Sequence, residues 1–203
     1  MRRLIVPVIG LAVVLALSIP SFAQEVNYPK AEIFGGFSIS SMGVASVDPT
    51  TGLPTTLRNS FWGWQGSANG NLTHSLAIVG DFGGQYKTVA GVPMNSYQFL
   101  FGPRITFRRP RVTPFVHALF GGAKLGTGSF SFTDPITGLS ATIPGASSTG
   151  LGLAMGGGID VNMNDRLALR VPQFDWTPMH VGGVWTNNVI RIGIGLVVKA
   201  GQK

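Results

Sequence analysis

The sequence has no cysteine and little charge. None of its 203 residues is Cys, and Asp, Glu, Lys and Arg together make up 11% of the chain, against about 25% in an average protein. Without thiols there is no disulfide framework, thiolate zinc site, cysteine nucleophile or cysteine-linked lipid anchor. The low charge and the 44% hydrophobic content exclude a disordered chain, which would be charged and poor in apolar residues. Such a composition is unusual for a soluble domain.

Groups that carry catalysis or bind metals are also scarce. The only histidines are His74, His117 and His180, and no two of them have the spacing of metal ligands. No serine or acid is placed beside His117 by its spacing in the sequence. We therefore predict no enzyme activity, no metal site and no cofactor; a lipid-acting barrel enzyme would need such a partner for His117.

Long hydrophobic runs occur only at the start of the chain. Arg2 and Arg3 precede an apolar run over residues 4–19, and Ser21 and Ala23 place small residues before a cleavage site. This pattern is typical of a secretory signal peptide, so we predict a cleaved signal over residues 1–23 and a single domain over residues 24–203. An uncleaved membrane anchor is the alternative, because the run approaches the spanning length.

The charge that remains after cleavage is mildly basic. Residues 24–203 contain 13 Lys and Arg against 8 Asp and Glu. These cations form no stripe with interleaved aromatic residues, so nucleic acid is not predicted as a partner. The 29 glycines show no period of three, which excludes collagen.

What the sequence does contain is one repeated pattern. Segments of about ten residues alternate apolar with small or polar side chains and are separated by turn residues. We predict eight strands, at residues 30–40, 59–72, 75–87, 95–108, 112–126, 148–162, 166–177 and 187–199. An even number of strands, each long enough to cross a bilayer, predicts an all-β fold: an eight-stranded antiparallel up-and-down transmembrane β-barrel.

The connections between these segments alternate in length. The short ones are residues 72–75, 108–111 and 163–165, and the long ones are residues 41–58, 88–94, 127–147 and 178–186. Short turns at one end and long loops at the other are typical of outer-membrane barrels. Two long loops share a motif, Asp-Pro-Thr-Thr-Gly-Leu-Pro at 48–54 and Asp-Pro-Ile-Thr-Gly-Leu-Ser at 134–140. The motif suggests projecting hairpins, although a chance recurrence of turn-favouring residues is the alternative.

The two faces of each predicted strand differ in side-chain volume. In the last segment Ile190, Ile192 and Ile194 share one face, whereas Arg191 and Gly193 share the other. Because the interior of an eight-stranded barrel is only wide enough for side chains to fill, we expect the bulky face to point outward into lipid. A secreted lipocalin-like carrier, with the two faces reversed, is the alternative.

Large aromatic residues gather at the long-loop ends of the strands. They are Trp62, Trp64, Tyr86, Tyr97 and Trp176. Side chains of this kind lie at the membrane–water interface of outer-membrane barrels. We therefore predict that these five residues form one aromatic girdle.

The small-residue face carries the charged residues of the strands. The acids are Glu32, Asp81, Asp160 and Asp175, and the bases are Lys87, Arg104, Arg170 and Arg191. Arg170 and Asp175 both face inward only if Pro172 marks a bulge. Because buried charges must be paired, we predict a luminal charge network that plugs the barrel. A narrow polar pore for small solutes is the alternative.

Several segments resemble a known family. They are residues 31–39, 113–123, 156–160, 164–170 and 173–176, and they are similar to the small eight-stranded outer-membrane β-barrels, such as the barrel part of OmpA and OmpX. The resemblance implies residence in the outer membrane of a diderm bacterium, contact with outer-membrane lipid and insertion by the barrel-assembly machinery. It also implies roles in envelope integrity, adhesion or minor solute passage, and leaves the external ligand unknown.

Overall fold

The computed structural model describes residues 28–202, apart from residue 49 and residues 134–137. The predicted signal peptide therefore lies outside the described residues. Eight long strands are present: β1 (Pro29–Val47), β2 (Pro54–Asn71), β3 (Leu76–Val89), β4 (Val92–Thr106), β5 (Val112–Thr127), β8 (Ser147–Asn162), β9 (Leu167–Trp176) and β12 (Ile190–Gln202). Four short strands lie between them: β6 (Phe130–Thr133), β7 (Ser140–Ile143), β10 (Met179–Val181) and β11 (Val184–Thr186).

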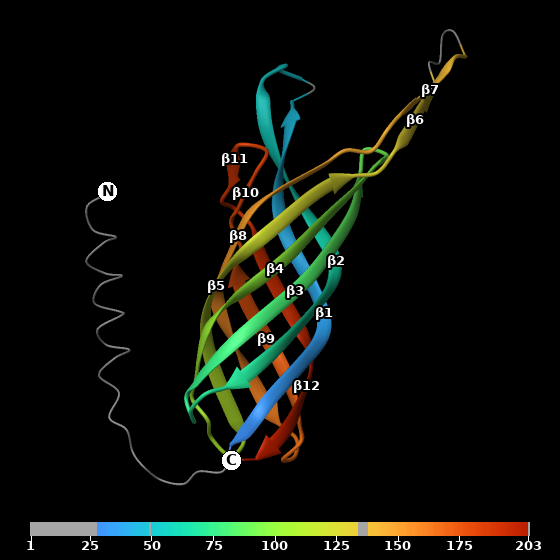
Figure 1. Cartoon of the computed structure of the whole chain (residues 1–203). Coiled ribbons are helices and arrows are strands. Elements are labelled where there is room, and N and C mark those ends of the chain that lie inside the picture. Colours follow the sequence, from blue (N-terminus) through green and yellow to red (C-terminus); the bar gives the residue numbers. More distant parts are fainter. Residues whose placement is uncertain (1–27, 49, 134–137, 203) are drawn as a thin grey trace, which may run out of the picture.

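The eight long strands close into a barrel. Each pairs antiparallel with its neighbours in the order β1, β2, β3, β4, β5, β8, β9 and β12, and β12 pairs back to β1. Figure 1 shows the tilted strands around a common axis. The predicted eight-stranded antiparallel up-and-down barrel is confirmed. No helix in the described part of the chain is long and apolar enough to cross a membrane.

The predicted loops 41–58 and 88–94 are largely strand. Strands β1 and β2 stay paired as far as Val47 and Pro54, and β3 connects to β4 through Ala90 and Gly91 alone. These extensions are rich in Ser, Thr and Gly and lack the apolar alternation of the lipid-facing segments. Their backbone groups nevertheless continue the pairing of the neighbouring strands.

The other two long loops carry short hairpins. Strands β6 and β7 form a separate two-stranded sheet, and β10 and β11 pair with each other beside β8. In Figure 1 the β6–β7 hairpin projects beyond the end of the barrel. The first copy of the repeated motif closes a tight turn, because Asp48 Oδ1 accepts a hydrogen bond of 2.8 Å from the Thr50 amide and Gly52 has a φ of 67°. The second copy lies partly outside the described residues.

The bulky face of the sheet points outward. Trp62 is 54% exposed and Ile192 is 44% exposed, whereas Arg191, next to Ile192, is 1% exposed. A lipocalin-like carrier would bury the first two side chains in its interior. That alternative is therefore wrong, and the apolar face meets the surroundings of the barrel, as in a membrane protein.

A bulge in β9 brings two charged side chains to the same face. Gly158 of β8 pairs with Gln173, but Asp160 pairs with Arg170, so β9 contains one extra residue at Val171 or Pro172. The pairing of β9 with β12 shifts at the same place. The bulge predicted at Pro172 is thus present, and both Arg170 and Asp175 are buried.

Candidate functional site

The barrel interior contains a chain of ion pairs. At its centre Asp160 binds two arginines. Arg170 donates from Nε to Oδ1 over 2.7 Å and from Nη2 to Oδ2 over 3.0 Å, and Arg104 Nη2 lies 3.0 Å from the same Oδ2. All three side chains are nearly inaccessible to solvent. This geometry supplies the paired, hydrogen-bonded partners that buried charges require.

The network continues toward the short-turn end through Glu32. Arg104 Nη1 lies 3.6 Å from one carboxylate oxygen of Glu32, and Arg108 Nη1 lies 2.6 Å from the other. The side-chain amides of Asn69 and Asn71 also donate to this carboxylate, over 3.4 and 3.3 Å. Glu32 therefore joins β1 to β2, to β4 and to the turn after β4.

The network continues toward the long-loop end through Asp175. Arg191 donates to its Oδ2 from Nη2 and Nε, over 2.8 and 3.2 Å, and His117 Nε2 lies 2.8 Å from Oδ1. Arg191 Nη2 also lies 2.9 Å from Asp81. Gln173 connects the two halves, because it accepts from Arg170 over 3.0 Å and donates to Asp175 over 2.7 Å.

Two inward-facing aromatic rings support the arginines. The guanidinium carbon of Arg104 lies 3.8 Å from the ring centre of Phe115, and that of Arg170 lies 4.4 Å from the same ring and 4.3 Å from Phe34. Such contacts stabilise a cation over an aromatic face. Neither ring was among the predicted site residues. Phe34 is nevertheless two residues after Glu32 and Phe115 is two before His117, so strand alternation places both rings inside.

Seven of the eight charged residues expected inside are buried and joined by these contacts, namely Glu32, Asp81, Arg104, Asp160, Arg170, Asp175 and Arg191. Lys87 is a correction: it is half-buried and takes part in none of the ion pairs found among the described residues. It lies six residues beyond Asp81 along β3, or about 20 Å. Arg108, the first residue of a predicted short connection, takes the place of the fourth base.

The spacing of the sequence places no acid beside His117, whereas the structure places Asp175 there. Asp175 is 58 positions away in the sequence, and β8 brings the two residues together, because its Gly156 pairs with His117 of β5 on one side and with Asp175 of β9 on the other. Sequence spacing reports only residues close along the chain, so it gave no sign of this contact. Since both side chains are buried, the contact belongs to the interior network.

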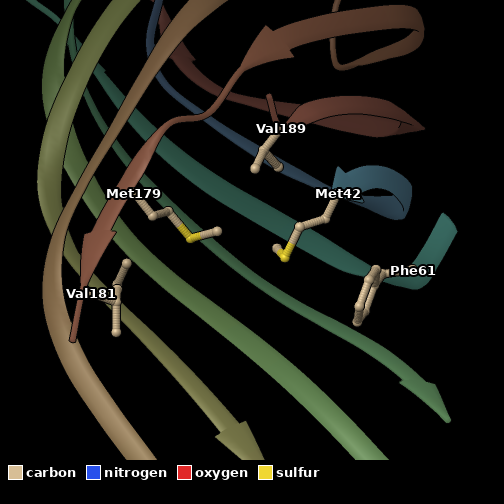
Figure 2. Packing of buried hydrophobic residues seen from close by; sticks show 6 residues of the cluster. Met42, Phe61, Met179, Val181 and Val189 are labelled. Carbon is tan, nitrogen blue, oxygen red and sulfur yellow. The ribbon is translucent and has the colours of Figure 1, made fainter. Parts of the chain in front are cut away.

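A cluster of apolar side chains lies in the long-loop half of the lumen. Met42, Phe61, Ala123, Met179, Val181 and Val189 form one buried cluster, with Met94 and Leu125 packed against it. In Figure 2 the side chains of Met42 and Met179 extend toward the same space inside the barrel. Ser40 pairs with Arg191 across β1 and β12, and Met42 is the next inward residue of β1, so this apolar cluster begins directly beyond the charges.

A row of polar atoms along β2 has no protein partner. Among the described residues, the buried atoms Gln65 Oε1, Ser67 Oγ, Asn69 Oδ1 and Asn71 Oδ1 accept or donate no hydrogen bond within the chain. They occupy successive inward positions from the level of Gly83 down to the short-turn mouth. Buried polar groups of this kind are usually satisfied by internal water.

The five aromatic residues of the predicted girdle lie on the outer face. Trp62, Trp64, Tyr86 and Trp176 are exposed and Tyr97 is half-exposed. Trp64 Nε1 donates to the Tyr86 hydroxyl over 3.3 Å, and the rings of Tyr86 and Tyr97 meet edge to face at 5.8 Å. Trp176 Nε1 donates to the Asn187 carbonyl over 2.6 Å. Each ring thus has an apolar body directed outward, and two of the indoles have their N–H groups satisfied.

Comparison with known proteins identifies the architecture. Neisserial surface protein A shares 14% identity with this chain at a TM-score of 0.60, over 86% of this chain and 99% of that protein. The attachment invasion locus protein Ail of Yersinia pestis shares 15% identity at a TM-score of 0.56, over 84% of this chain and 98% of Ail. No curated protein sequence matches this chain.

The family of this chain is identified by a sequence match. Residues 9–197 match the outer membrane protein beta-barrel domain, a match that covers nearly the whole chain and all eight long strands except the end of β12. The exposed apolar belt and the closed ring of strands agree with that assignment. The chain therefore belongs to the family of outer membrane protein beta-barrel domains.

Proposed function

We propose that this outer-membrane barrel has a closed interior and acts through its exposed long-loop end, in a structural or interaction role and not as an enzyme. The observation that carries the proposal is the unbroken set of side-chain contacts across the lumen, from Arg108 to Asp81. A barrel built to conduct would leave an aqueous path, as barrels of sixteen or more strands do.

The charged part of the lumen opposes the passage of solutes. Four acids, Glu32, Asp81, Asp160 and Asp175, face four arginines, Arg104, Arg108, Arg170 and Arg191. An ion crossing this region would have to separate pairs that are out of water, and the loss of one partner from a buried pair costs about 3–5 kcal/mol. The network therefore acts as a rigid plug.

The apolar cluster supports the same proposal. Met42, Phe61 and Met179 belong to one buried apolar cluster between the charge network and the long-loop end. Apolar constrictions stop conduction by excluding water, even where the backbone is wide enough. The proposed barrier to solutes therefore has two parts along the lumen. The charge network opposes passage through its ion pairs, and the apolar cluster, here called the apolar seal, opposes it by excluding water.

A narrow pore is the second candidate, and one observation favours it. The unpaired polar atoms on β2, at Gln65, Ser67, Asn69 and Asn71, would suit a file of water beside the arginines. Such a file would reach from the short-turn mouth to the middle of the barrel. It would conduct only if the apolar cluster moved aside.

Planar-bilayer recording separates the two candidates. We expect the wild-type protein to show no discrete conductance across the voltage range. The triple variant Met42→Ala, Phe61→Ala, Met179→Ala removes the apolar seal and should admit water as far as the charges. A matched control, Phe120→Ala on the exposed outer face, should remain silent. Discrete channel events in the wild type would overturn the closed-barrel proposal.

The exposed end offers surface for an interaction role. The β6–β7 hairpin extends beyond the barrel and exposes Phe132 and Ile143. Ail, a structural neighbour at a TM-score of 0.53 in its complex with the heparin analogue sucrose octasulfate, is an attachment protein by name. This likeness supports a surface role in general terms and leaves the ligand of the present barrel open.

The location and topology can be tested with cysteine labelling, since the chain has no native cysteine. We infer export by a cleaved signal over residues 1–23, insertion into outer-membrane lipid by the barrel-assembly machinery, and an outward long-loop end. A membrane-impermeant maleimide should then label Ser131→Cys in the β6–β7 hairpin on intact cells. It should reach Asn164→Cys, in the turn between β8 and β9, only after the outer membrane is permeabilised. The reverse pattern would contradict the proposed orientation.

A further inference from the structure

We propose that the short-turn mouth of the barrel is a binding site for an anionic phosphoryl group, carried by a phospholipid headgroup or by a soluble phosphate. A cavity of about 900 Å³ opens there. It is lined by the start of β1, by the three short turns and by the end of β12. The assignment of this mouth to the periplasmic leaflet rests on the orientation proposed above, whereas the binding site itself does not.

The cavity lining is strongly basic. Its charged residues are Arg108, Arg109, Arg166 and Lys199, with Asp165 as the one acid in the described lining. Within the part of the chain that the structure describes, Arg109 and Arg166 are exposed and belong to no ion pair. Lys199 Nζ donates over 2.6 Å to the neutral side chain of Asn162. Three of the four cations thus have no bonded counter-charge, and only Arg108 is bound to a carboxylate, that of Glu32.

Asn162 fixes the Lys199 ammonium and the backbone that carries Arg109. Its side-chain amide donates to the carbonyls of Arg109 and Pro110 over 3.0 and 3.1 Å, and its carbonyl accepts from Lys199. One amide therefore fastens the β4–β5 turn and β12 to the end of β8. A site whose donors are held in place before the ligand arrives loses less entropy on binding.

The other turns at this mouth are fixed in the same way. Asn164 Oδ1 accepts from the backbone amides of Arg166 and Leu167, over 2.9 and 2.8 Å, which locks the turn that carries Arg166. Arg108 Nε donates to the His74 carbonyl over 2.9 Å and ties the β2–β3 turn to the β4–β5 turn. The basic cradle, formed by Arg108, Arg109, Arg166 and Lys199, therefore rests on cross-linked turns, from which the exposed side chains of Arg109 and Arg166 extend.

The donor set fits phosphoryl oxygens. Guanidinium groups present planar forks of N–H donors that match phosphate geometry, and an ammonium adds a point charge. Anionic phospholipid headgroups attract basic residues at a membrane surface. Burial and the charge of Arg108 lower the pKa of His74, which keeps this imidazole uncharged at neutral pH, so the arginines and Lys199 supply the positive charge.

The test uses the full barrel folded in nonionic detergent, with binding followed by NMR of backbone amides at low ionic strength. Inorganic phosphate is titrated first, followed by short-chain phosphatidylglycerol and, as the zwitterionic reference, short-chain phosphatidylcholine. The variant Arg109→Gln, Arg166→Gln removes two exposed cations from the cradle. Its matched control is Arg58→Gln, Lys124→Gln, which removes two exposed cations at the opposite end. Thermal melting checks that both variants stay folded.

We expect saturable binding in the wild type, with shifts centred on Arg109, Asn164 and Arg166. Binding should weaken by about tenfold in the cradle variant, because hydrogen bonds to charged groups are the strong ones, and it should be unchanged in the control. Binding of phosphatidylglycerol without inorganic phosphate would identify the lipid headgroup as the source. Binding of phosphate without the lipid would identify a soluble phosphate.

Two results would overturn the site. One is the absence of saturable binding of either probe. The other is an equal loss of binding in the cradle and control variants, which would attribute the binding to general surface charge. Because the titration is done in detergent, its outcome does not depend on the orientation of the barrel. A failed cysteine-labelling pattern and a failed phosphate titration are therefore distinguishable.

Discussion

Arg170 and Asp160 face each other across β9 and β8, joined by two hydrogen bonds of 2.7 and 3.0 Å. The pair exists because the bulge at Val171 or Pro172 changes the register between the strands, so that Arg170 opposes Asp160. A bulge is one of the few places where a sheet accepts proline. A backbone irregularity thus determines which charges meet in the lumen.

The first prediction concerns this pair. Asp160→Asn keeps the shape of the side chain but leaves Arg170 and Arg104 without their shared counter-charge. We expect the free energy of unfolding to fall by about 3–5 kcal/mol, measured by urea titration in lipid vesicles. The control Asp165→Asn, in an exposed turn, should change it by less than about 0.5 kcal/mol. Equal effects of the two variants would contradict the network.

The second prediction separates Arg108 from Lys87. Arg108→Gln removes a 2.6 Å contact with the buried Glu32 carboxylate and should destabilise the barrel by about 1–3 kcal/mol. Lys87→Gln should change the free energy of unfolding by less than about 0.5 kcal/mol, since Lys87 has no ion pair among the described residues. The same urea titration compares the two, and a larger loss in the Lys87 variant would restore the sequence-based assignment.

The third prediction concerns two glycines that differ in their surroundings. A methyl group added at Gly63 would overlap the backbone carbonyl of Gly84 on β3, whereas one added at Gly122 would meet nothing within 4 Å. Backbone atoms of a paired strand cannot move aside without disturbing the sheet. We expect Gly63→Ala to cost about 1–3 kcal/mol and Gly122→Ala to be neutral, as judged from their thermal unfolding in the same detergent. Similar melting temperatures would refute the close approach of β2 and β3.

The fourth prediction places Trp176 at the membrane interface. In a variant that keeps Trp176 and has phenylalanine at positions 62, 64 and 185, fluorescence should be quenched more strongly by lipids brominated near the headgroup than by lipids brominated near the chain end. The reason is that the amphipathic indole ring prefers the headgroup level, and the Trp176 N–H is bonded to the carbonyl of Asn187, in the connection that precedes β12. Stronger quenching by the deep bromines would show that Trp176 lies deeper than the interface and does not belong to the girdle. A variant that keeps only Trp62 measures the depth of a second girdle residue in the bilayer by the same quenching.

Local patterns predicted much of this architecture. Alternation with a period of two predicted the eight strands and the outward direction of Ile192 and Trp62, and the position of Pro172 predicted the bulge. These features depend on neighbours in the sequence, because successive side chains of a strand point to opposite faces whatever the strand pairs with. The extensions of β1 to β4 beyond the predicted strands were missed. Their Ser- and Thr-rich sequence resembles a loop, and only pairing with the neighbouring strand gives these residues a strand conformation.

The sequence by itself determined which side chains enter the lumen, through strand parity, and which meet the surroundings, through their volume. Only the tertiary structure decided which luminal groups touch. The tilt and stagger of the strands set their relative heights, so Arg108 reaches Glu32, Asp175 meets His117, and Lys87 stays apart. The basic cradle at the short-turn mouth has the same origin, because three turns distant in the sequence come together only when β12 closes the ring on β1.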